Sequence, residues 1–339
     1  MNARPIAGPK SYTDEWYSLR VFDPDRKERP VVFGASEAMK AVTNPLELYL
    51  LKRGELEQPE QTEDMEVGSL MEPVVLEMYR RRSGNFILAD CPMYFHAEHP
   101  FMAATPDAIG IPQKDGQVSF DDVKNYWGVD AKTSHDRMFI KDAIADTDVD
   151  KYGSEGTDLV PSYVLWQMQA QCAVMGFPFV DVPVLFGRKY RQYRVDRDET
   201  LIQAIIDAEK ELAERIINAD PPEPNWTHPN ARQCIKALNG LEPGLSIVLS
   251  DEGHERWLNV ARRKAQIQEL HDANLEDTNR VLAEMEGAET ALFPQGTREI
   301  RRIVVAESLY TLADLEELRK KIGQVKRRGY ERLTERKTK

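Results

Sequence analysis

Cysteine is scarce in this chain of 339 residues. Cys91, Cys172 and Cys234 are the only three, and they are odd in number and widely separated. This usage argues against a disulfide framework, a cysteine metal cluster and an iron–sulfur centre. Buried or idle thiols are the simpler interpretation.

Long hydrophobic runs are also missing. No apolar segment reaches the length that spans a bilayer, and the N-terminal stretch MNARPIAGPK lacks the hydrophobic region of a signal peptide. We therefore expect a cytoplasmic protein without a membrane partner. The sequence contains no GxxxxGK[ST] phosphate loop, zinc finger or basic zipper, which argues against an ATP-driven motor and against these DNA-reading modules.

Positive charge is in deficit overall but is concentrated in a few segments. The formal net charge is −12, which disfavours nonspecific binding to nucleic acid because the phosphate backbone attracts positive charge. Three stretches are nevertheless basic: YRRRSG, FGRKYRQYRVDR and the C-terminal LRKKIGQVKRRGYERLTERKTK. An acidic protein with such patches can still hold DNA in one groove, so charge alone leaves a nucleic-acid substrate open.

The first two-thirds of the chain alternates between helical and strand patterns. The period of the apolar residues predicts a helix over GSLMEPVVLEMYRRRSG, with Pro73 in its first turn or at a kink and Gly84 as its stop. Further helices are predicted over residues 15–20, 44–53, 161–175 and 198–219, and strands over residues 86–111, 128–134, 179–187 and 188–197. This order predicts an α/β fold with a central mixed sheet flanked by helices.

A cluster of prolines in DPPEPNWTHPN marks the clearest boundary in the chain. We predict one domain over residues 1–220 and a mainly helical extension over residues 221–339. The extension is expected to contain a long helix from about residue 250, a strand in REIRRIVVAES and a terminal helix over LADLEELRKKIGQVKRRGYERL. Its basic end favours a DNA-contacting or oligomer-forming role, and a solvated helical cap is the alternative.

The stretch GVDAKTS poses the central question of the sequence. Alternate side chains of a strand point to the same face, so Asp130 and Lys132 would share one face. They could form a plain ion pair, which is the usual structural role of an aspartate–x–lysine sequence, or they could be two parts of a site. An ion pair alone predicts a direct contact with no neighbouring carboxylate, whereas a site predicts a second carboxylate close to Asp130.

A second carboxylate is available upstream. Asp107 opens the preceding predicted strand in TPDAIG, and KDGQ is a good hairpin turn between the two strands. If that hairpin forms, Asp107 and Asp130 meet on adjacent strands. Paired carboxylates make a hard oxygen site suited to Mg²⁺ or Mn²⁺.

Two flanking helices contribute further polar side chains. Glu72 lies on the predicted helix before the strands, and Gln167 lies on the helix after them. A bound metal can polarise a phosphoryl group, and Lys132 could orient or deprotonate the attacking water or bind the phosphate. Each residue alone is more simply explained as a solvated or packing residue, but their joint order favours phosphodiester hydrolysis.

These residues resemble a known superfamily. PD-(D/E)XK nucleases carry a proline–aspartate pair, a hairpin and then an acid–x–lysine sequence, which here match Pro106–Asp107 and Asp130–Ala131–Lys132. Within it, the chain resembles phage lambda exonuclease and the YqaJ-type viral recombinase nucleases over roughly the first 220 residues. The matching blocks are EWYSLR, FGASEAMKAV, NPLELYLLKRG, GSLMEPVVLEMYRRRSG, ATPDAIG, VDAKTS and WQMQAQCAVMG.

The resemblance implies a fold and roles for the core residues. It implies a restriction-endonuclease-like PD-(D/E)XK core, and the C-terminal helix–hairpin–helix is similar to the extension of YqaJ-type members. Asp107 and Asp130 would bind the metal, and Lys132 would serve the attacking water. Glu72 would support the metal site or its water, and Gln167 would line the site. Many family members carry Glu where this chain has Asp130, and the superfamily pattern permits either.

The resemblance also implies a substrate and partners. Arg20 and Ser36 match the arginine and serine that bind a 5′-phosphate at a duplex end, although a surface arginine and a simple N-cap are the plain alternatives. The implied activity is a metal-dependent 5′→3′ exonuclease that acts on double-stranded DNA ends and leaves 3′ overhangs for a single-strand annealing protein. A ring-shaped homo-oligomer, commonly a trimer, and a phage or prophage origin in a bacterial host cell are implied as well. An endonuclease or single-strand-specific nuclease, or a non-catalytic DNA-binding scaffold, remains the alternative.

Overall fold

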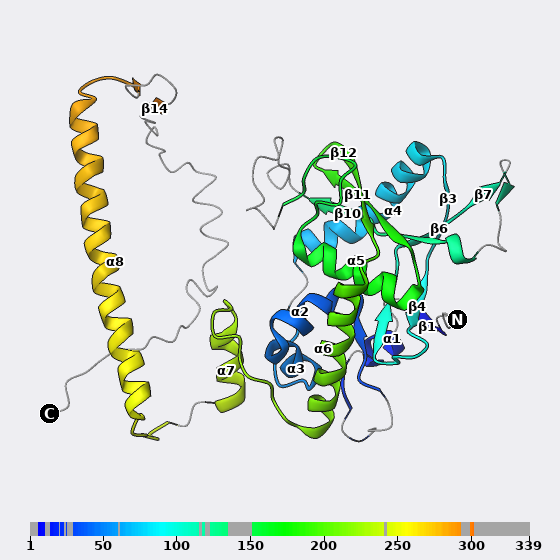
Figure 1. The fold of residues 1–339 in the computed structure, drawn as a ribbon, viewed down its shortest axis with the longest axis horizontal. Helices are drawn as coiled ribbons and strands as arrows, with labels where there is room; N and C mark the ends of the chain where they lie inside the picture. Colours follow the sequence, from blue (N-terminus) through cyan, green and yellow to red (C-terminus); the bar gives the residue numbers. More distant parts are fainter. Residues whose placement is uncertain are drawn as a thin grey trace, which may run out of the picture. The chain divides into compact units, whose positions relative to one another are not determined.

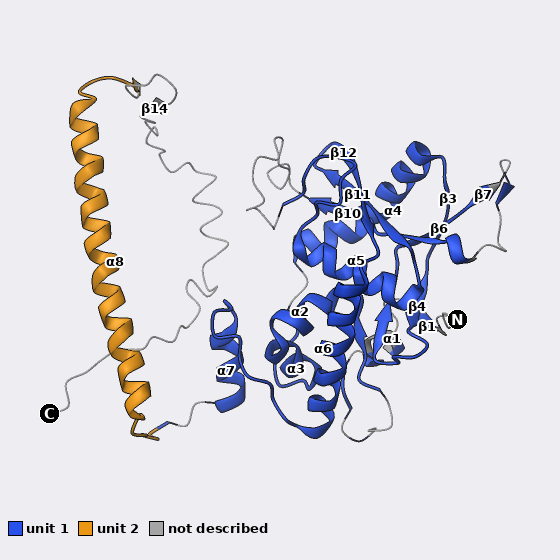
Figure 2. Cartoon of the chain, in the orientation of Figure 1, with its two compact units in different colours: residues 1–243 blue, residues 244–339 orange. Residues whose placement is uncertain are grey.

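The computed structural model describes most of the chain in two compact units. The described residues are 6–10, 14–19, 21–23, 25, 30–59, 62–114, 117–118, 123–134, 151–240, 243–292 and 299–301. Figure 2 shows the two units, residues 1–243 and residues 244–339, in different colours. The first unit contains all the predicted site residues that the structure describes.

A mixed sheet forms the centre of the first unit (Figure 1). Strand β11 pairs antiparallel with β12 and parallel with both β9 and β10, while β9 continues antiparallel to β6, and β6 to β3. The bounds are β3 Phe86–Ala89, β6 Ala108–Ile111, β9 Trp127–Val129, β10 Lys132–Ser134, β11 Phe179–Phe186 and β12 Lys189–Asp196. Parallel and antiparallel pairs coexist, which confirms the predicted mixed sheet.

Helices cover both faces of this sheet. On one face, Leu76 and Tyr79 of α4 (Glu63–Ser83) pack with Val129 of β9. On the other, α5 (Ser162–Met175) and α6 (Glu199–Asn218) pack in a larger cluster with Ile109, Val180, Val182 and Val195. Alternation along the strands therefore divides the side chains between an α4 face and an α5 face. The predicted α/β class, a mixed sheet flanked by helices, is confirmed.

A smaller sheet and several short helices complete the first unit. The smaller sheet has the order β1–β4–β5–β2, with β1 Ile6–Lys10, β2 Phe33–Gly34, β4 Pro92–Phe95 and β5 Met102–Ala104. The short helices are α1 Asp14–Leu19, η1 Ala35–Glu37, α2 Ala38–Thr43, α3 Pro45–Lys52, η2 Val123–Asn125 and α7 Ala231–Asn239. All three cysteines are buried, as expected for structural thiols.

The predicted continuous strand over residues 128–134 is interrupted between β9 and β10, and Asp130 lies in the interruption. β9 ends at Val129 and β10 begins at Lys132, although both keep the same register on β11. Ala131 therefore lies opposite Pro183 of β11, and proline has no N–H group to donate to a neighbouring strand. The gap leaves Asp130 between two strands, where its N–H donates to the carbonyl oxygen of Asp181 at 3.0 Å.

The predicted hairpin turn also takes a different form. The strands that flank KDGQ are β7 (Gln113–Lys114) and β8 (Gln117–Val118), which pair with each other as a small separate hairpin. Strands β6 and β9 nevertheless pair antiparallel, with Ala108 opposite Val129. The consequence drawn from the hairpin, that Asp107 and Asp130 end on adjacent strands, therefore holds with a longer connection.

Helix α4 begins earlier than its sequence pattern predicts. Thr62 caps it by accepting a hydrogen bond from the N–H of Met65, so Pro73 lies inside the helix and not in its first turn. The predicted stop is confirmed, because Gly84 takes a left-handed conformation with φ of 70°.

The segment after residue 220 packs against α3 within the first unit. Asn230 Nδ2 donates to the buried Glu47 carboxylate at 3.0 Å, and Asn225 Nδ2 donates to the Thr43 carbonyl at 2.8 Å. Cys234 of α7 is fully buried in the cluster that contains Leu46. These contacts place the end of the compact unit at residue 243, beyond the residue 220 expected from the proline cluster.

The described part of the second unit contains a long helix and a strand pair. Helix α8 spans Asp251–Glu284, and β13 (Thr290–Leu292) pairs antiparallel with β14 (Glu299–Arg301). The predicted terminal helix and the C-terminal basic stretch lie outside the described residues. Among the helices that the structure describes, none combines the length and apolar character needed to cross a membrane.

Candidate active site

Asp107 and Asp130 lie next to each other at one end of the β6–β9 pair. Asp107 immediately precedes β6 and Asp130 immediately follows β9, and the pairing of Ala108 with Val129 places the two acids opposite each other. The N–H of Ala131 donates to Asp107 Oδ2 at 2.8 Å, which ties the two chain segments together beyond the last strand pair. The sequence prediction that these carboxylates meet is thus consistent with the geometry.

Asp130 is enclosed by hydrogen-bond donors. Its side chain is 1% exposed, and Oδ1 accepts an ion-paired hydrogen bond from Lys132 Nζ. Oδ2 accepts from Gln167 Nε2 at 3.2 Å and from Gln171 Nε2 at 2.6 Å. The structure therefore contains both features that the sequence posed as alternatives, a direct Asp130–Lys132 ion pair and a neighbouring carboxylate, Asp107.

Burial and neighbouring negative charge raise the pKa of two acidic side chains at the site, Asp107 and Glu72. Burial and the charge of Asp130 raise the pKa of Asp107 well above its ordinary value, and Glu72 adds to the effect. Burial also raises the pKa of Glu72, with a further contribution from the negative charge of Asp130. Glu72 of α4 thus belongs electrostatically to the same cluster as the two aspartates.

Lys132 supplies positive charge to this cluster. Burial on its own lowers the pKa of Lys132, but the charges of Asp130 and Asp107 outweigh burial and leave that pKa above its ordinary value. The side chain is therefore an ammonium ion at neutral pH. In this conformation it can orient a water molecule or balance negative charge on a phosphate, but it cannot accept a proton.

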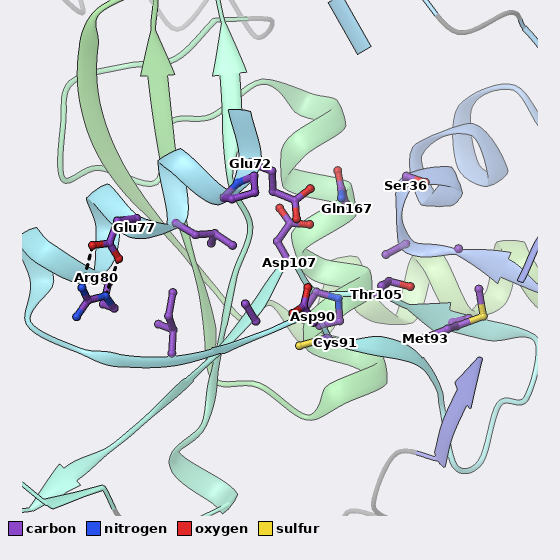
Figure 3. Close-up of a pocket in the computed structure, with 18 residues that line it drawn as sticks. Ser36, Glu72, Glu77, Arg80, Asp90, Cys91, Met93, Thr105, Asp107 and Gln167 are labelled. Atoms are coloured by element: carbon purple, nitrogen blue, oxygen red, sulfur yellow. Dashed lines mark hydrogen bonds and ion pairs between the residues drawn. The ribbon is translucent and has the colours of Figure 1, made fainter. Parts of the chain in front are cut away.

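A pocket of about 960 Å³ opens in front of the cluster. Figure 3 shows the carboxylates of Glu72 and Asp107 pointing toward each other, with Gln167 beside them. Ser36 of η1, which directly precedes α2, is exposed and lines the same pocket farther from these carboxylates. Arg20, the predicted partner of Ser36, lies outside the described residues.

The donor set fits a hard divalent cation. Carboxylate oxygens are the ligands that Mg²⁺ prefers, and the mutual repulsion that raises the pKa of Asp107 would be relieved by a nearby cation. Within the described residues, no three acidic, histidine or cysteine side chains converge as a ready-made metal cage. Because Mg²⁺ is commonly held by one or two carboxylates together with water and substrate phosphate, Asp107 and Asp130 are the residues that would hold it.

Gln171 is a site residue that is not among those predicted from the sequence. Gln171 is fully buried and makes a shorter hydrogen bond to Asp130 than Gln167 does. Its signal was present in the sequence, because residues four apart on a helix lie on the same face and Gln171 follows Gln167 by four positions. Gln169 between them points elsewhere and bonds to Asp196 and Asp198.

Comparison with known proteins identifies a family and a relative that this chain resembles. Residues 22–178 match the YqaJ-like viral recombinase domain. The chain is 23% identical over 281 residues to a protein of Bacillus subtilis (strain 168) named Uncharacterized protein YqaJ, covering 81% of this chain and 79% of that one.

Two solved structures are also similar. The crystal structure of an alkaline exonuclease (LHK-Exo) from Laribacter hongkongensis has a TM-score of 0.43 and 18% identity, covering 61% of this chain and 94% of that chain. LHK-Exo in complex with dAMP has a TM-score of 0.42 and 18% identity, covering 57% of this chain and 92% of that chain. The family match includes every candidate site residue except Arg20. The match of residues 22–178 to the YqaJ-like viral recombinase domain agrees with the resemblance seen in the sequence.

Proposed function

We propose that this protein is a metal-dependent deoxyribonuclease, and more specifically a 5′→3′ exonuclease that acts on double-stranded DNA ends. The observation that carries the proposal is the convergence of Asp107, Asp130 and Lys132 at one end of the β6–β9 pair, beside an open pocket. The match of residues 22–178 to a viral recombinase domain supports the same conclusion.

Each side chain has a distinct part in the proposed reaction. Asp107 and Asp130 would hold Mg²⁺ or Mn²⁺, which when bound polarises the phosphoryl group and lowers the pKa of water. Lys132, as an ammonium ion, would orient the attacking water or balance charge on the scissile phosphate. Glu72 has a raised pKa at the wall of the pocket and would take the proton that water releases. Gln167 reaches both Asp130 and the pocket and would position Asp130 against the substrate.

Recognition of a DNA end would involve Ser36, which lines the pocket farther from the carboxylates. Ser36 would donate a hydrogen bond to a 5′-phosphate, and Arg20 would grip the same group with its guanidinium. Cleavage from that end would leave a 3′ single-stranded overhang, which a phage-type single-strand annealing protein would receive. A homo-oligomeric ring, commonly a trimer, around the DNA would let an acidic protein present its basic segments to the duplex.

The deciding experiment compares degradation of end-labelled linear duplex with Mg²⁺ by wild type, Lys132→Ala and Lys124→Ala. Lys124 is an exposed lysine on η2 and serves as the matched control. We expect loss of cleavage in Lys132→Ala alone. Equal rates in wild type and Lys132→Ala would contradict the assignment of the site.

Substrate choice tests the finer parts of the proposal. Wild type should degrade 5′-phosphorylated ends faster than 5′-hydroxyl ends, and Arg20→Ala should lose that preference while it still binds metal. Cleavage of a covalently closed circle would indicate an endonuclease instead. Light scattering that shows only monomer, with and without DNA, would count against the ring.

One observation favours a non-catalytic alternative. The Lys132 ammonium is paired directly with Asp130, as in a structural ion pair. A DNA-binding scaffold on a nuclease fold would show this pair, would bind duplex DNA and would cleave none with Mg²⁺ or Mn²⁺. Metal-dependent cleavage by wild type removes this alternative.

A further inference from the structure

The two oxygens of the Asp130 carboxylate have different surroundings. Oδ1 contacts the Lys132 ammonium, which lies two residues along the same chain segment. Oδ2 accepts both of its hydrogen bonds from helix α5, from Gln167 and from Gln171. The helix therefore engages one oxygen and leaves the other for the lysine and for a metal ion.

The two glutamines differ in how far they can take part in substrate binding. Gln167 is partly exposed and lines the pocket, so a substrate can reach its amide. Gln171 is 0% exposed and lies one turn farther along α5, with Nε2 at 2.6 Å from Asp130 Oδ2. The contact from Gln171 is therefore shielded from water and from substrate.

The orientation of the Gln171 amide is dictated by Asp130. An ionised carboxylate only accepts hydrogen bonds, so the amide nitrogen must face it and the amide oxygen must face away. That oxygen, Oε1, is buried, and no donor among the described residues reaches it. A buried acceptor without a partner destabilises the folded protein, so stability alone does not account for this glutamine.

We propose that Gln171 is a positioning residue that fixes the Asp130 carboxylate so that Oδ1 is presented to the metal ion and to Lys132. The inference rests on the proposed nuclease function, which it deepens by assigning separate tasks to two residues of one helix face. Gln171 fixes the Asp130 carboxylate from the buried side, and Gln167 contacts both that carboxylate and the pocket where the substrate would bind. Groups that orient metal ligands in this way commonly change activity or metal affinity by about 10- to 100-fold when they are removed.

Gln169 provides a matched control on the same helix. It is also buried, at 1% exposed, and it makes two hydrogen bonds, from Nε2 to the Asp196 carbonyl and from the Asp198 N–H to Oε1. Neither partner belongs to the candidate site. A substitution at Gln169 therefore reports what the loss of a buried glutamine does to the fold, without a direct effect on Asp130.

The experiment compares Gln171→Met, Gln171→Glu and Gln169→Met with wild type. Methionine keeps the approximate volume and removes the donor, and glutamate keeps the shape but sets a carboxylate against Asp130. For each protein we measure melting temperature with and without Mg²⁺, kcat and KM on linear duplex, and the Mg²⁺ concentration that gives half-maximal rate.

The expected pattern separates positioning from packing. Gln171→Met should lower kcat about 10- to 100-fold, raise the half-saturating Mg²⁺ concentration and leave KM for DNA within about twofold. Gln171→Glu should be at least as impaired, because its charge repels Asp130. Gln169→Met should lose melting temperature but keep kcat and the Mg²⁺ requirement.

Two results would overturn the inference, and in a third case only the melting temperatures with Mg²⁺ can test it. Wild-type kcat and Mg²⁺ requirement in Gln171→Met would overturn it, and so would an equal loss of kcat in Gln169→Met. If wild type itself cleaves no DNA, the proposed function fails, and the Mg²⁺-induced rise in melting temperature decides the inference alone. A smaller rise in Gln171→Met than in wild type then supports it, and an equal rise overturns it.

Discussion

Replacing Glu209 with glutamine tests how a buried carboxyl group limits the stability of the first unit. Glu209 lies on α6 with 1% exposure, and its Oε2 has no hydrogen-bond partner among the described residues. The Lys52 ammonium, whose charge partly offsets the rise in the Glu209 pKa, is bonded to Glu37 at 2.8 Å and to the Val32 carbonyl at 2.7 Å. Burial and the negative charge of Glu37 therefore raise the pKa of Glu209 well above its ordinary value.

The sign of the pH dependence follows from this shift. A carboxyl group with a higher pKa in the folded state binds its proton more tightly there than in the unfolded chain. Its favourable contribution is fully present below pH 4.5, the ordinary value for glutamate, and is lost as pH rises toward the folded pKa. The loss amounts to about 1.4 kcal/mol of unfolding free energy for each pH unit in that window, because one proton is released on unfolding.

Urea denaturation at several pH values measures the effect. Glutamine has the shape of the protonated acid but does not titrate, so Glu209→Gln and wild type should have similar stability near pH 4. Above pH 4.5 the variant should become progressively more stable than wild type, by about 1.4 kcal/mol for each pH unit, until the difference levels off at the folded pKa. Parallel stability curves for the two proteins from pH 4 to pH 8 would refute the reasoning.

Three further substitutions test the metal site, the sheet and the α7 segment. Asp107→Asn should abolish the rise in melting temperature that Mg²⁺ gives wild type, and a retained rise would remove Asp107 from the metal site. Gly110→Ala should destabilise the first unit by about 1–3 kcal/mol in urea, because a Cβ atom there would lie 2.0 Å from the Trp127 ring; wild-type stability would contradict this. Asn230→Ala removes the donor that lies 3.0 Å from the Glu47 carboxylate. We expect the free energy of unfolding to fall by about 1–3 kcal/mol and proteolysis within residues 225–239 to become faster. Wild-type stability and wild-type proteolysis would contradict this prediction.

Several elements were predictable because their signals are local. The first-turn proline of α3 and the glycine stop of α4 depend on the chain within a few residues, and both lie where the sequence placed them. The pairing of Asp107 with Asp130 was predictable for a related reason, since two strands joined by a turn signal pair antiparallel. The strands beside KDGQ, β7 and β8, pair with each other instead, but this insertion does not change the pairing of β6 with β9.

Other features depend on partners that are distant in the sequence. The break between β9 and β10 reflects Pro183 on β11, which becomes a neighbour of Ala131 only after the parallel pairing forms. The proline cluster near residue 220 favours a domain boundary there, because prolines typically mark loops. Asn225 and Asn230 in the same region bond to α2 and α3, and hydrogen bonds to residues about 180 positions away leave no periodic signal in the sequence.

The candidate site departs from what stability alone would select, and this departure bears on function. Burial and the negative charge of Asp130 raise the pKa of both Asp107 and Glu72, and the Lys132 ammonium offsets these effects only in part. The clusters that α4 and α5 form on the two faces of the sheet consist of hydrophobic side chains. Their burial stabilises the framework that holds the charged groups in place. A purely structural ion pair between Asp130 and Lys132 would require neither Asp107 nor the unpaired carbonyl of Gln171. Buried carboxylates with raised pKa values that meet beside one pocket are typical of a functional site.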